Sequence, residues 1–322
     1  MVGVVLLNMG GPDSLESVRP FLQNLFSDRE IIQLGPKFMQ PFIARMIARK
    51  RAPKSAKAYA KIGGKTPLTK ITYDQAKALE TSLKNKGLSH IMCGVGMRYW
   101  APRTPDTLKE LAQLGVKKVI GLSLYPHYSK ATTGSSIADF LKGCEKLGLE
   151  SAVIESYPDH KSYIKGLAKL TLQKISEIEN KDPSTFELIY SAHSLPKKMV
   201  DEGDPYVDHL KLTIAALEKK TGIKGILCFQ SRSGPVEWLT PATDDLLQQL
   251  VSKGKKHIVA LPISFVSDHI ETLYEIDMLY SDMVKKAGAH LYRVPALNSH
   301  PDFIECLTDI TLNKLEEKGW LE

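Results

Sequence analysis

Three carboxylates lie close together late in the sequence, at Asp268, Glu271 and Glu275. Residues three and four positions apart meet on a helix surface, so this spacing predicts that all three share one helix face. Like charges on one stripe repel each other, and burial would raise the pKa values of their carboxyl groups. Such a row is typical of a path for protons or cations, with a solvated helix face as the simpler alternative.

Two histidines accompany the carboxylates: His269 in the same stretch, and His193 within Ser-Ala-His-Ser-Leu-Pro. A single histidine is more often a hydrogen-bonded core residue than a ligand, and that interpretation stays open for His193. An imidazole facing a row of carboxylates suits a divalent cation of borderline hardness such as Fe²⁺. Two protein ligands make a weak site, which suits an ion that is passed on better than a structural metal.

Short apolar runs alternate with amphipathic stretches along the chain, and several runs are nearly continuous, as in strands buried on both faces. We expect strands at residues 2–8, 91–98, 119–124, 152–156, 188–193, 226–230, 258–263 and 291–294. We expect helices at about residues 15–27, 37–50, 68–86, 104–114, 133–147, 160–180, 204–221, 241–253, 269–287 and 301–318. This alternation predicts an α/β protein with parallel sheets.

The eight expected strands divide four and four around residue 157, and 322 residues are enough for about two domains. We therefore expect two similar β/α domains side by side. Ligands of such sheets bind beyond the carboxyl ends of the strands. Arg98, His193 and the segment 268–275 all fall at or just after the ends of expected strands, so the sequence places its reactive residues at those ends.

A basic segment distinguishes the first half of the chain. Residues 37–86 hold 13 basic and 2 acidic residues, a net charge of +11, against +7 for the whole chain. Such a local field attracts anionic small molecules, anionic lipid or nucleic acid, with a solvated basic helix face as the alternative.

The helix expected at 37–50 combines this charge with a broad apolar face. Arg49, Lys50 and Arg51 follow its apolar residues, which are Phe38, Met39, Phe42, Ile43, Met46 and Ile47. An ordinary core-facing helix is one interpretation. A partly exposed apolar lip flanked by cations is the other, and it suits a flat apolar ligand or a membrane surface.

Several common sites lack their sequence marks. The chain contains no GxGxxG, GxxxxGKS or GxSxG motif and no recognisable nucleic-acid-binding motif. Its four cysteines show no CxxC or zinc spacing, which indicates structural thiols in a reducing compartment. No apolar stretch is long enough to span a membrane, and the first apolar run is too short for a signal peptide. We therefore expect a cytoplasmic protein that binds no nucleic acid.

Eight sequence motifs together resemble ferrochelatase, the enzyme that inserts Fe²⁺ into a porphyrin to make haem. They are LLNMGGP (6–12), IGGKTPL (62–68), MRYW (97–100), LYPHYSKATTGSS (124–136), SAHSLP (191–196), GDPY (203–206), FQSRSGPVEWLTP (229–241) and FVSDHIETLYEID (265–277). The resemblance runs from Leu6 to about Asp309, nearly the whole chain. SAHSLP together with the last motif is highly specific.

The resemblance implies the chelatase fold. This fold has two Rossmann-like domains, each a mainly four-stranded parallel sheet flanked by helices, with a porphyrin cleft between them. On this basis residues 1–157 form the first domain with the porphyrin lip, and residues 158–303 form the second domain with the metal site. Residues 304–322 form a C-terminal helix that packs back on the first domain.

The resemblance also assigns site residues. It makes four residues catalytic: His193, Glu271, Glu275 and His269. His193 and Glu271 are also the metal ligands, Glu275 is the next carboxylate of the row, and His269 and Asp268 flank it. The residues implied on the porphyrin side are Met9, Arg51, Tyr59, Thr66, Arg98, Tyr99 and Trp238. Many members continue the carboxylate row eight residues after Glu271, where this chain has Leu279.

The activity implied is insertion of Fe²⁺ into protoporphyrin, the terminal step of haem biosynthesis, with no organic cofactor. A coproporphyrin-using branch usually carries Tyr where this chain has Met9, and it remains an alternative. A non-catalytic porphyrin or haem carrier is a second alternative, which would not need the carboxylate row. Some members carry an iron–sulfur cluster, but the scattered cysteines predict none here. We expect peripheral contact with the inner membrane face through residues 37–50.

Overall fold

The computed structural model describes residues 1–179, 182 and 184–321. The chain divides into two compact units, Met1–Ser156 with Asn298–Glu322, and Tyr157–Leu297. The sequence placed these divisions after residues 157 and 303. The second division therefore comes earlier, and the loop before the last helix belongs to the first unit.

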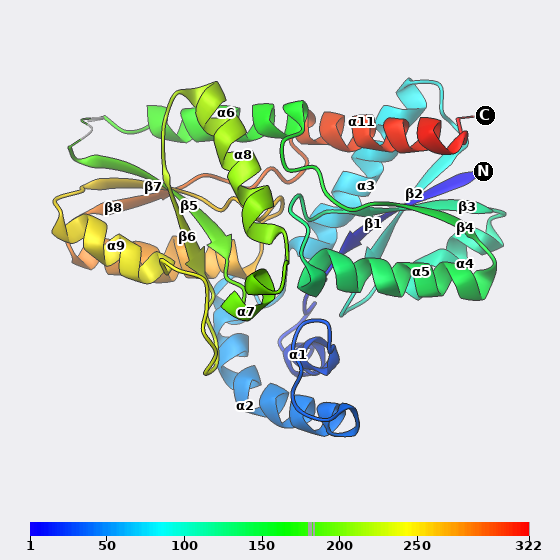
Figure 1. Cartoon of the computed structure of the whole chain (residues 1–322), viewed down its shortest axis with the longest axis horizontal. Helices are drawn as coiled ribbons and strands as arrows, with labels where there is room; N and C mark the ends of the chain where they lie inside the picture. The colour runs from blue at the N-terminus through cyan, green and yellow to red at the C-terminus, as the bar shows by residue number, and fades with distance from the viewer. Residues whose placement is uncertain (180–181, 183, 322) are drawn as a thin grey trace. The chain divides into compact units, whose positions relative to one another are not determined.

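The first unit is built on a parallel sheet in the order β2-β1-β3-β4 (Figure 1). The strands are β1 (Val2–Asn8), β2 (Ile91–Met97), β3 (Lys118–Ser123) and β4 (Glu150–Ile154). All seven residues of β1 are buried, because helices cover both faces of the sheet. This explains why its sequence is a continuous apolar run rather than an alternating one.

Helices of the first unit lie on both sides of this sheet (Figure 1). One side carries α4 (Thr104–Gln113) and α5 (Ser135–Leu147), and the other carries α3 (Leu68–Asn85) and α11 (Pro301–Lys318). The last helix is tied to α3, since Thr308 Oγ1 donates to Ser82 Oγ at 2.9 Å. Two further helices, α1 (Val18–Ser27) and α2 (Gln40–Lys61), pack on each other.

The second unit repeats the same strand order, β6-β5-β7-β8, and is again entirely parallel. Its strands are β5 (Phe186–His193), β6 (Ile226–Gln230), β7 (His257–Leu261) and β8 (His290–Arg293). Its helices are α6 (Lys161–Ser176), α7 (Lys197–Asp201), α8 (Tyr206–Thr221), α9 (Thr243–Ser252), the π-helix η3 (Glu271–Tyr280) and α10 (Ser281–Lys286). In both units the second strand lies on one side of the first strand and the third strand lies on its other side. Sheets of this kind bind ligands beyond the carboxyl ends of the first and third strands, where the order reverses.

The eight expected strands are confirmed, but two expected helices differ. The helix expected at 37–50 begins as a 3-10 turn, Lys37–Met39, and α2 then continues to Lys61. The helix expected at 269–287 divides into η3 and α10. The helix α2 extends beyond the expected end at residue 50, and its second half still buries Ala58 and Tyr59. None of the helices within the described ranges is both long and apolar enough to cross a membrane.

A buried ion pair joins three segments of the first unit. Asp28, at the end of α1, accepts hydrogen bonds through Oδ2 from Arg98 at 2.9 Å, Tyr99 at 2.8 Å and Ser135 at 2.5 Å. Burial alone would raise the pKa of Asp28. The hydrogen bonds from Ser135, the Glu30 backbone and Tyr99, and then the charge of Arg98, outweigh burial and hold this pKa below its ordinary value.

We predict that Asp28→Asn destabilises the protein in a pH-dependent way. Because the pKa is lowered on folding, the unfolded chain binds this proton first. The stabilisation is complete above the unfolded value of about 3.9 and is lost as pH falls through the folded value. Urea unfolding should give a loss of about 2 kcal/mol at pH 7, and the loss should shrink as pH falls below about 4.

Asp74→Asn is the matched control, because Asp74 forms an exposed ion pair with Lys70 in the same unit. Its effect should stay within about 0.5 kcal/mol at every pH. A difference between wild type and Asp28→Asn that does not change with pH would contradict the ion-pair account.

Candidate functional site

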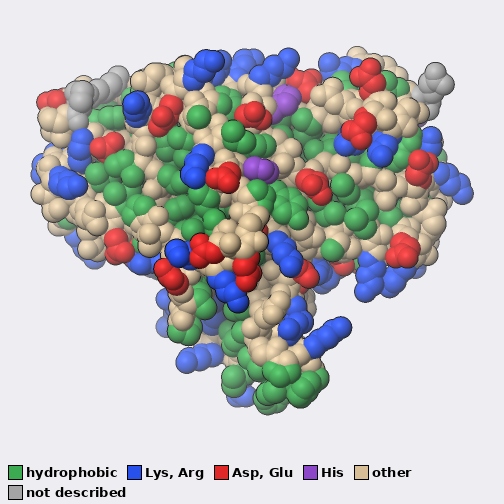
Figure 2. Space-filling view, viewed as in Figure 1, with side chains coloured by type: hydrophobic (Ala, Val, Ile, Leu, Met, Phe, Trp, Pro, Cys, Tyr) green, Lys and Arg blue, Asp and Glu red, His purple; other side chains and the backbone are tan. Residues whose placement is uncertain are grey.

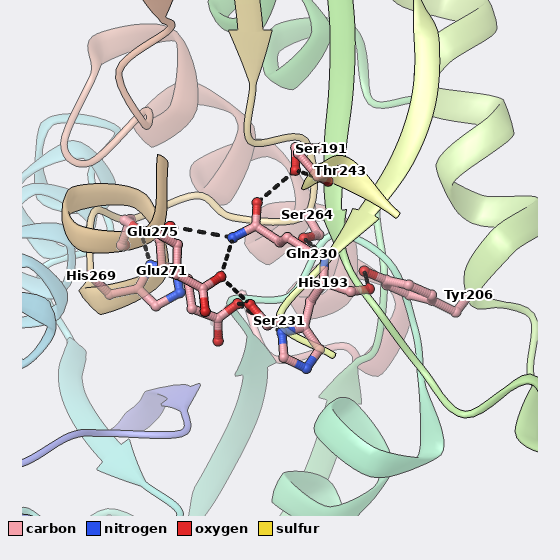
Figure 3. A network of polar contacts seen from close by, with 11 residues as sticks. Ser191, His193, Tyr206, Gln230, Ser231, Thr243, Ser264, His269, Glu271 and Glu275 are labelled. Atoms are coloured by element: carbon pink, nitrogen blue, oxygen red, sulfur yellow. Dashed lines mark hydrogen bonds and ion pairs between the residues drawn. The ribbon is translucent and has the colours of Figure 1, made fainter. Parts of the chain in front are cut away.

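The site in the second unit begins where β5 ends. His193 is the last residue of β5, and its Nδ1 lies 2.7 Å from Oε2 of Glu271, the first residue of η3 (Figure 3). The chain reaches Glu271 from β7, the neighbour of β5 in the sheet. The sequence-predicted pair, 78 residues apart, is therefore brought together at the point where the connections after β5 and β7 diverge.

The backbone of His193 is held on both sides. Its N–H donates to Ser264 Oγ at 3.0 Å, and its carbonyl accepts from the Tyr206 hydroxyl at 3.0 Å. Its ring meets the ring of Phe265 edge-on, with centroids 6.4 Å apart. These contacts fix the direction of the imidazole, because the backbone N–H, the backbone carbonyl and the ring of His193 each have a partner.

The carboxylates follow on a π-helix, in which hydrogen bonds run from residue i to i+5. Such helices are rare and occur frequently at functional sites. Within η3, Glu271 and Glu275 point toward the end of β6 (Figure 3). The expectation that Asp268 shares their helix face is wrong, because it precedes the helix. Asp268 instead forms an ion pair with Arg293 at 2.7 Å.

Two residues that the sequence analysis did not select connect the carboxylates. The Ser231 hydroxyl lies 2.8 Å from Glu271 Oε2 and 2.5 Å from Glu275 Oε2. Gln230 Nε2 donates to Glu275 Oε2 at 3.2 Å and to the Glu271 carbonyl at 3.3 Å. Both residues lie at the carboxyl end of β6, beside β5. That position was the available signal, since ligands gather at these ends.

This polar network continues into the interior of the unit. Ser191 Oγ donates to Gln230 Oε1 at 2.7 Å and lies 2.9 Å from Thr243 Oγ1. The Thr243 hydroxyl in turn lies 3.3 Å from Cys228 Sγ. Since Ser191 donates to one end of the Gln230 amide, the other end must present its N–H₂ to the carboxylates.

The electrostatics separate the two carboxyl groups. Burial would raise the pKa of Glu271, but the charge and hydrogen bond of His193 outweigh it and lower that pKa. Burial and the charge of Glu271 raise the pKa of Glu275. Burial would lower the pKa of His193, yet Glu271 and then Glu275 raise it. The pair thus divides into an ionised Glu271 beside His193 and a more readily protonated Glu275.

The number of hydrogens available around Ser231 also indicates that Glu275 is the protonated carboxyl group. A serine hydroxyl carries one hydrogen, and Ser231 lies within hydrogen-bonding distance of two carboxyl oxygens. One of those carboxyl groups must therefore supply a second hydrogen for both contacts to be hydrogen bonds. The raised pKa of Glu275 makes it that group.

His269 lies in the same region but has a different state. Burial lowers its pKa, and its Nδ1 lies 3.1 Å from the Ser267 carbonyl. A carbonyl only accepts, so Nδ1 carries the hydrogen and Nε2 keeps its lone pair. The ring also meets Phe265 edge-on, with centroids 4.4 Å apart. His269 is thus a neutral imidazole buried beside the ring that contacts His193.

The residues expected on the porphyrin side divide between the units. Six of them lie in the first unit: Met9, Arg51, Tyr59, Thr66, Arg98 and Tyr99. Trp238 lies in the second, on a segment that pairs with Pro196 just after His193. Met9 and Tyr99 are adjacent, because the Tyr99 N–H donates to the Met9 carbonyl at 2.9 Å.

The other porphyrin-side residues differ in exposure. Tyr59 and Thr66 are buried, and a methyl group added at Gly11 would lie 2.8 Å from Thr66 Cγ2. Arg51 is exposed on α2 and lies over the Phe26 ring, 5.3 Å from its centroid. Arg98 and Tyr99 are held by Asp28, which limits their movement.

The chain matches known proteins over nearly its whole length. A family model described as ferrochelatase matches residues 1–315. The ferrochelatase of Desulfotalea psychrophila is 50% identical over 312 residues, covering 96% of this chain and 96% of that protein. The ferrochelatase of Geotalea uraniireducens is 49% identical over 311 residues, covering 95% of this chain and 96% of that protein.

Solved structures support the fold. SirB from Bacillus subtilis with Fe³⁺ has a TM-score of 0.56 at 8% identity, covering 100% of this chain and 99% of that chain. The sirohydrochlorin chelatase SirB of the subspecies spizizenii, in complex with cobalt, has a TM-score of 0.52 at 10% identity, covering 98% and 94%. The expected two Rossmann-like sheets of the chelatase fold are thus confirmed, and the sequence matches show that this chain belongs to the ferrochelatase family.

Proposed function

We propose that this chain inserts Fe²⁺ into protoporphyrin to form haem, the terminal step of haem biosynthesis. The chain belongs to a family of enzymes that are named for inserting iron into a porphyrin. The observation that carries the proposal is the 2.7 Å contact between His193 and Glu271 at the carboxyl edge of a parallel sheet, with Glu275 joined to it through Ser231.

In this proposal His193 and Glu271 hold the incoming ion. One imidazole and one carboxylate suit a divalent metal of borderline hardness. Among the described residues, no cluster of three or more His, Cys, Asp or Glu side chains is arranged to hold a metal. An ion with two protein ligands keeps other positions for water or pyrrole nitrogen, so it can be transferred to the ring.

The reaction also releases two protons, one for each pyrrole N–H that the metal replaces. In this proposal His193 or the Glu271–Glu275 row accepts them, and Glu275 does so after it has released the proton that it shares with Ser231. The raised pKa of Glu275 makes it able to hold a proton near neutral pH, while Glu271 stays ionised for the metal. Leu279 occupies the next position of the row and is exposed, so protons beyond Glu275 pass to solvent or to other groups.

Porphyrin binding in this proposal uses residues of the first unit. Arg51, Tyr59 and Thr66 hold the propionate edge, and the basic segment attracts a substrate that is a dianion at neutral pH. Binding contacts remote from the nitrogens provide the energy to bend the macrocycle, so that nitrogen lone pairs become accessible.

We also propose that residues 37–50, which form the 3-10 turn Lys37–Met39 and the first half of α2, touch an anionic membrane surface. Phe38, Phe42 and Met46 are 83%, 72% and 60% exposed, whereas Ala44 and Ala48 are buried. An ordinary core-facing helix does not fit this pattern, since alanine forms the covered stripe. Figure 2 shows hydrophobic side chains gathered at the tip formed by the α1–α2 segment, with Lys and Arg around them.

The proposal includes no organic cofactor and no iron–sulfur cluster. The four cysteines are free thiols on β2, α5, β6 and α11, so each lies on a different element. Stoichiometric acid-labile sulfide in the purified protein would contradict this part.

The metal pair can be tested by separating insertion from porphyrin binding. His193→Ala should reduce zinc insertion at least about 100-fold, since acid–base catalysis and metal placement are lost together. Glu271→Gln should act similarly, and Glu275→Gln less. Porphyrin affinity, measured by fluorescence titration, should stay within a few-fold. His257→Ala, at the amino end of β7, is the control and should retain activity. Substantial insertion by His193→Ala would refute its assignment.

Substrate choice can be tested at Met9. The wild type should have a larger kcat/KM for protoporphyrin than for coproporphyrin, because two further propionates would need partners when buried. Met9→Tyr should shift the ratio toward coproporphyrin, whereas Met46→Tyr, an exposed methionine on α2, should not. A wild type that prefers coproporphyrin would overturn the protoporphyrin assignment.

Membrane contact can be tested by liposome sedimentation. The triple variant Phe38→Ser, Phe42→Ser, Met46→Ser should bind anionic vesicles at least about tenfold less than wild type, since burial of each side chain contributes about 1.5–3 kcal/mol. The control replaces the exposed residues Leu114, Leu141 and Leu147 with Ser. Equal vesicle binding by both triple variants would reject the α2 contact.

A further inference from the structure

The residue between the two carboxylates has an unusual backbone. Ser231 has φ +69°, and within the described ranges only one other non-glycine residue, Asn298 at +45°, has a positive φ. This left-handed conformation disfavours side chains other than glycine, and it persists where the surroundings enforce it, often at active sites. A glycine would satisfy the backbone better, so the serine side chain is retained at a conformational cost.

The hydroxyl group accounts for that side chain. Ser231 Oγ lies 2.8 Å from Glu271 Oε2 and 2.5 Å from Glu275 Oε2, and it reaches them from the loop after β6 rather than from η3 itself (Figure 3). The preceding residue, Gln230, contacts the same helix through its amide. One short segment therefore fixes two successive carboxylates of the π-helix relative to the sheet.

We infer that Ser231 is a positioning residue for metal insertion. Its left-handed backbone directs one hydroxyl at both carboxylates, which sets the distance between the carboxylate beside His193 and the one that follows it. The inference rests on the proposed function, since it assigns those carboxylates to the metal and proton steps. It adds the Ser231 hydroxyl to the groups that metal insertion requires besides His193 and Glu271.

The alternative is that Ser231 is only a turn residue. The two accounts predict opposite results for Ser231→Gly, which removes the hydroxyl and relieves the backbone. If Ser231 serves the turn alone, glycine should maintain or improve both folding and activity. If the hydroxyl positions the carboxylates, glycine should maintain folding and lower activity. Ser231→Ala removes the hydroxyl and keeps the unfavourable backbone, so it should lower both.

The experiment measures zinc insertion into protoporphyrin, with metal and porphyrin varied separately, and thermal unfolding. We expect Ser231→Gly to unfold at or above the wild-type temperature. Its kcat/KM for the metal should fall about tenfold or more, because hydrogen bonds to charged groups are lost. Its KM for porphyrin should stay within about twofold. Asn298→Gly, which relieves the other left-handed residue, should leave insertion unchanged.

The outcomes separate this inference from the proposed function. If His193→Ala abolishes insertion while Ser231→Gly retains it, the positioning role is wrong and the metal pair stands. If both variants retain insertion, the proposed metal pair itself fails. A Ser231→Gly protein that does not fold also counts against the inference. The inference assumes that glycine relieves the backbone at this position, and that result would show that it does not.

Discussion

The contact between His193 and Glu271 depends on how the central strands of the second unit are paired. The two side chains come from the connections that leave β5 and β7, and those connections go to opposite faces of the sheet. Neighbouring parallel strands bring their carboxyl ends together, so the contact forms only if both strands are in register. The rest of the site depends on this, because Ser231 and Gln230 reach the same place from β6, the other neighbour of β5.

Burial of two like-charged groups makes the surrounding polar network necessary. A buried carboxylate is stable only when it is paired or hydrogen-bonded. Glu271 gains a partner in His193, whereas Glu275 lies beside a like charge and has its pKa raised. The Ser231 hydroxyl is shared between the two carboxyl groups, Gln230 donates to the carboxyl group of Glu275, and Ser191 fixes the Gln230 amide from inside the sheet. The unequal states of the two glutamates are therefore properties of the sheet edge.

The sequence predicted the parts of this arrangement that follow from local patterns. All eight strands were found, since continuous apolar runs mark strands covered on both faces. Glu271 was selected from the spacing of the carboxylates, and the resemblance to ferrochelatase paired it with His193 at the end of a strand. The π-helix was not found, because residues spaced for an i to i+4 helix do not reveal i to i+5 hydrogen bonding. Asp268 was wrongly placed on the carboxylate face for another reason, since the helix begins after it, at Glu271. Ser231 was missed because its importance lies in a backbone angle and in partners 40 and 44 residues away.

The helix α2 shows a different limit of prediction from sequence. Its positive charge is visible in the sequence, but the repulsion between cations on its surface follows only from the helix that forms. The helix carries seven basic and no acidic residues, and cations four positions apart, such as Arg45 with Arg49 and Lys57 with Lys61, repel each other by about 0.2–0.5 kcal/mol per pair. Its covered stripe of Gln40, Ala44 and Ala48 buries little apolar surface. An anion bound on this helix would relieve the repulsion, whether it is a porphyrin propionate or a lipid phosphate. Both proposed partners of the first unit therefore act on the same excess of positive charge, and each would strengthen the helix that binds it.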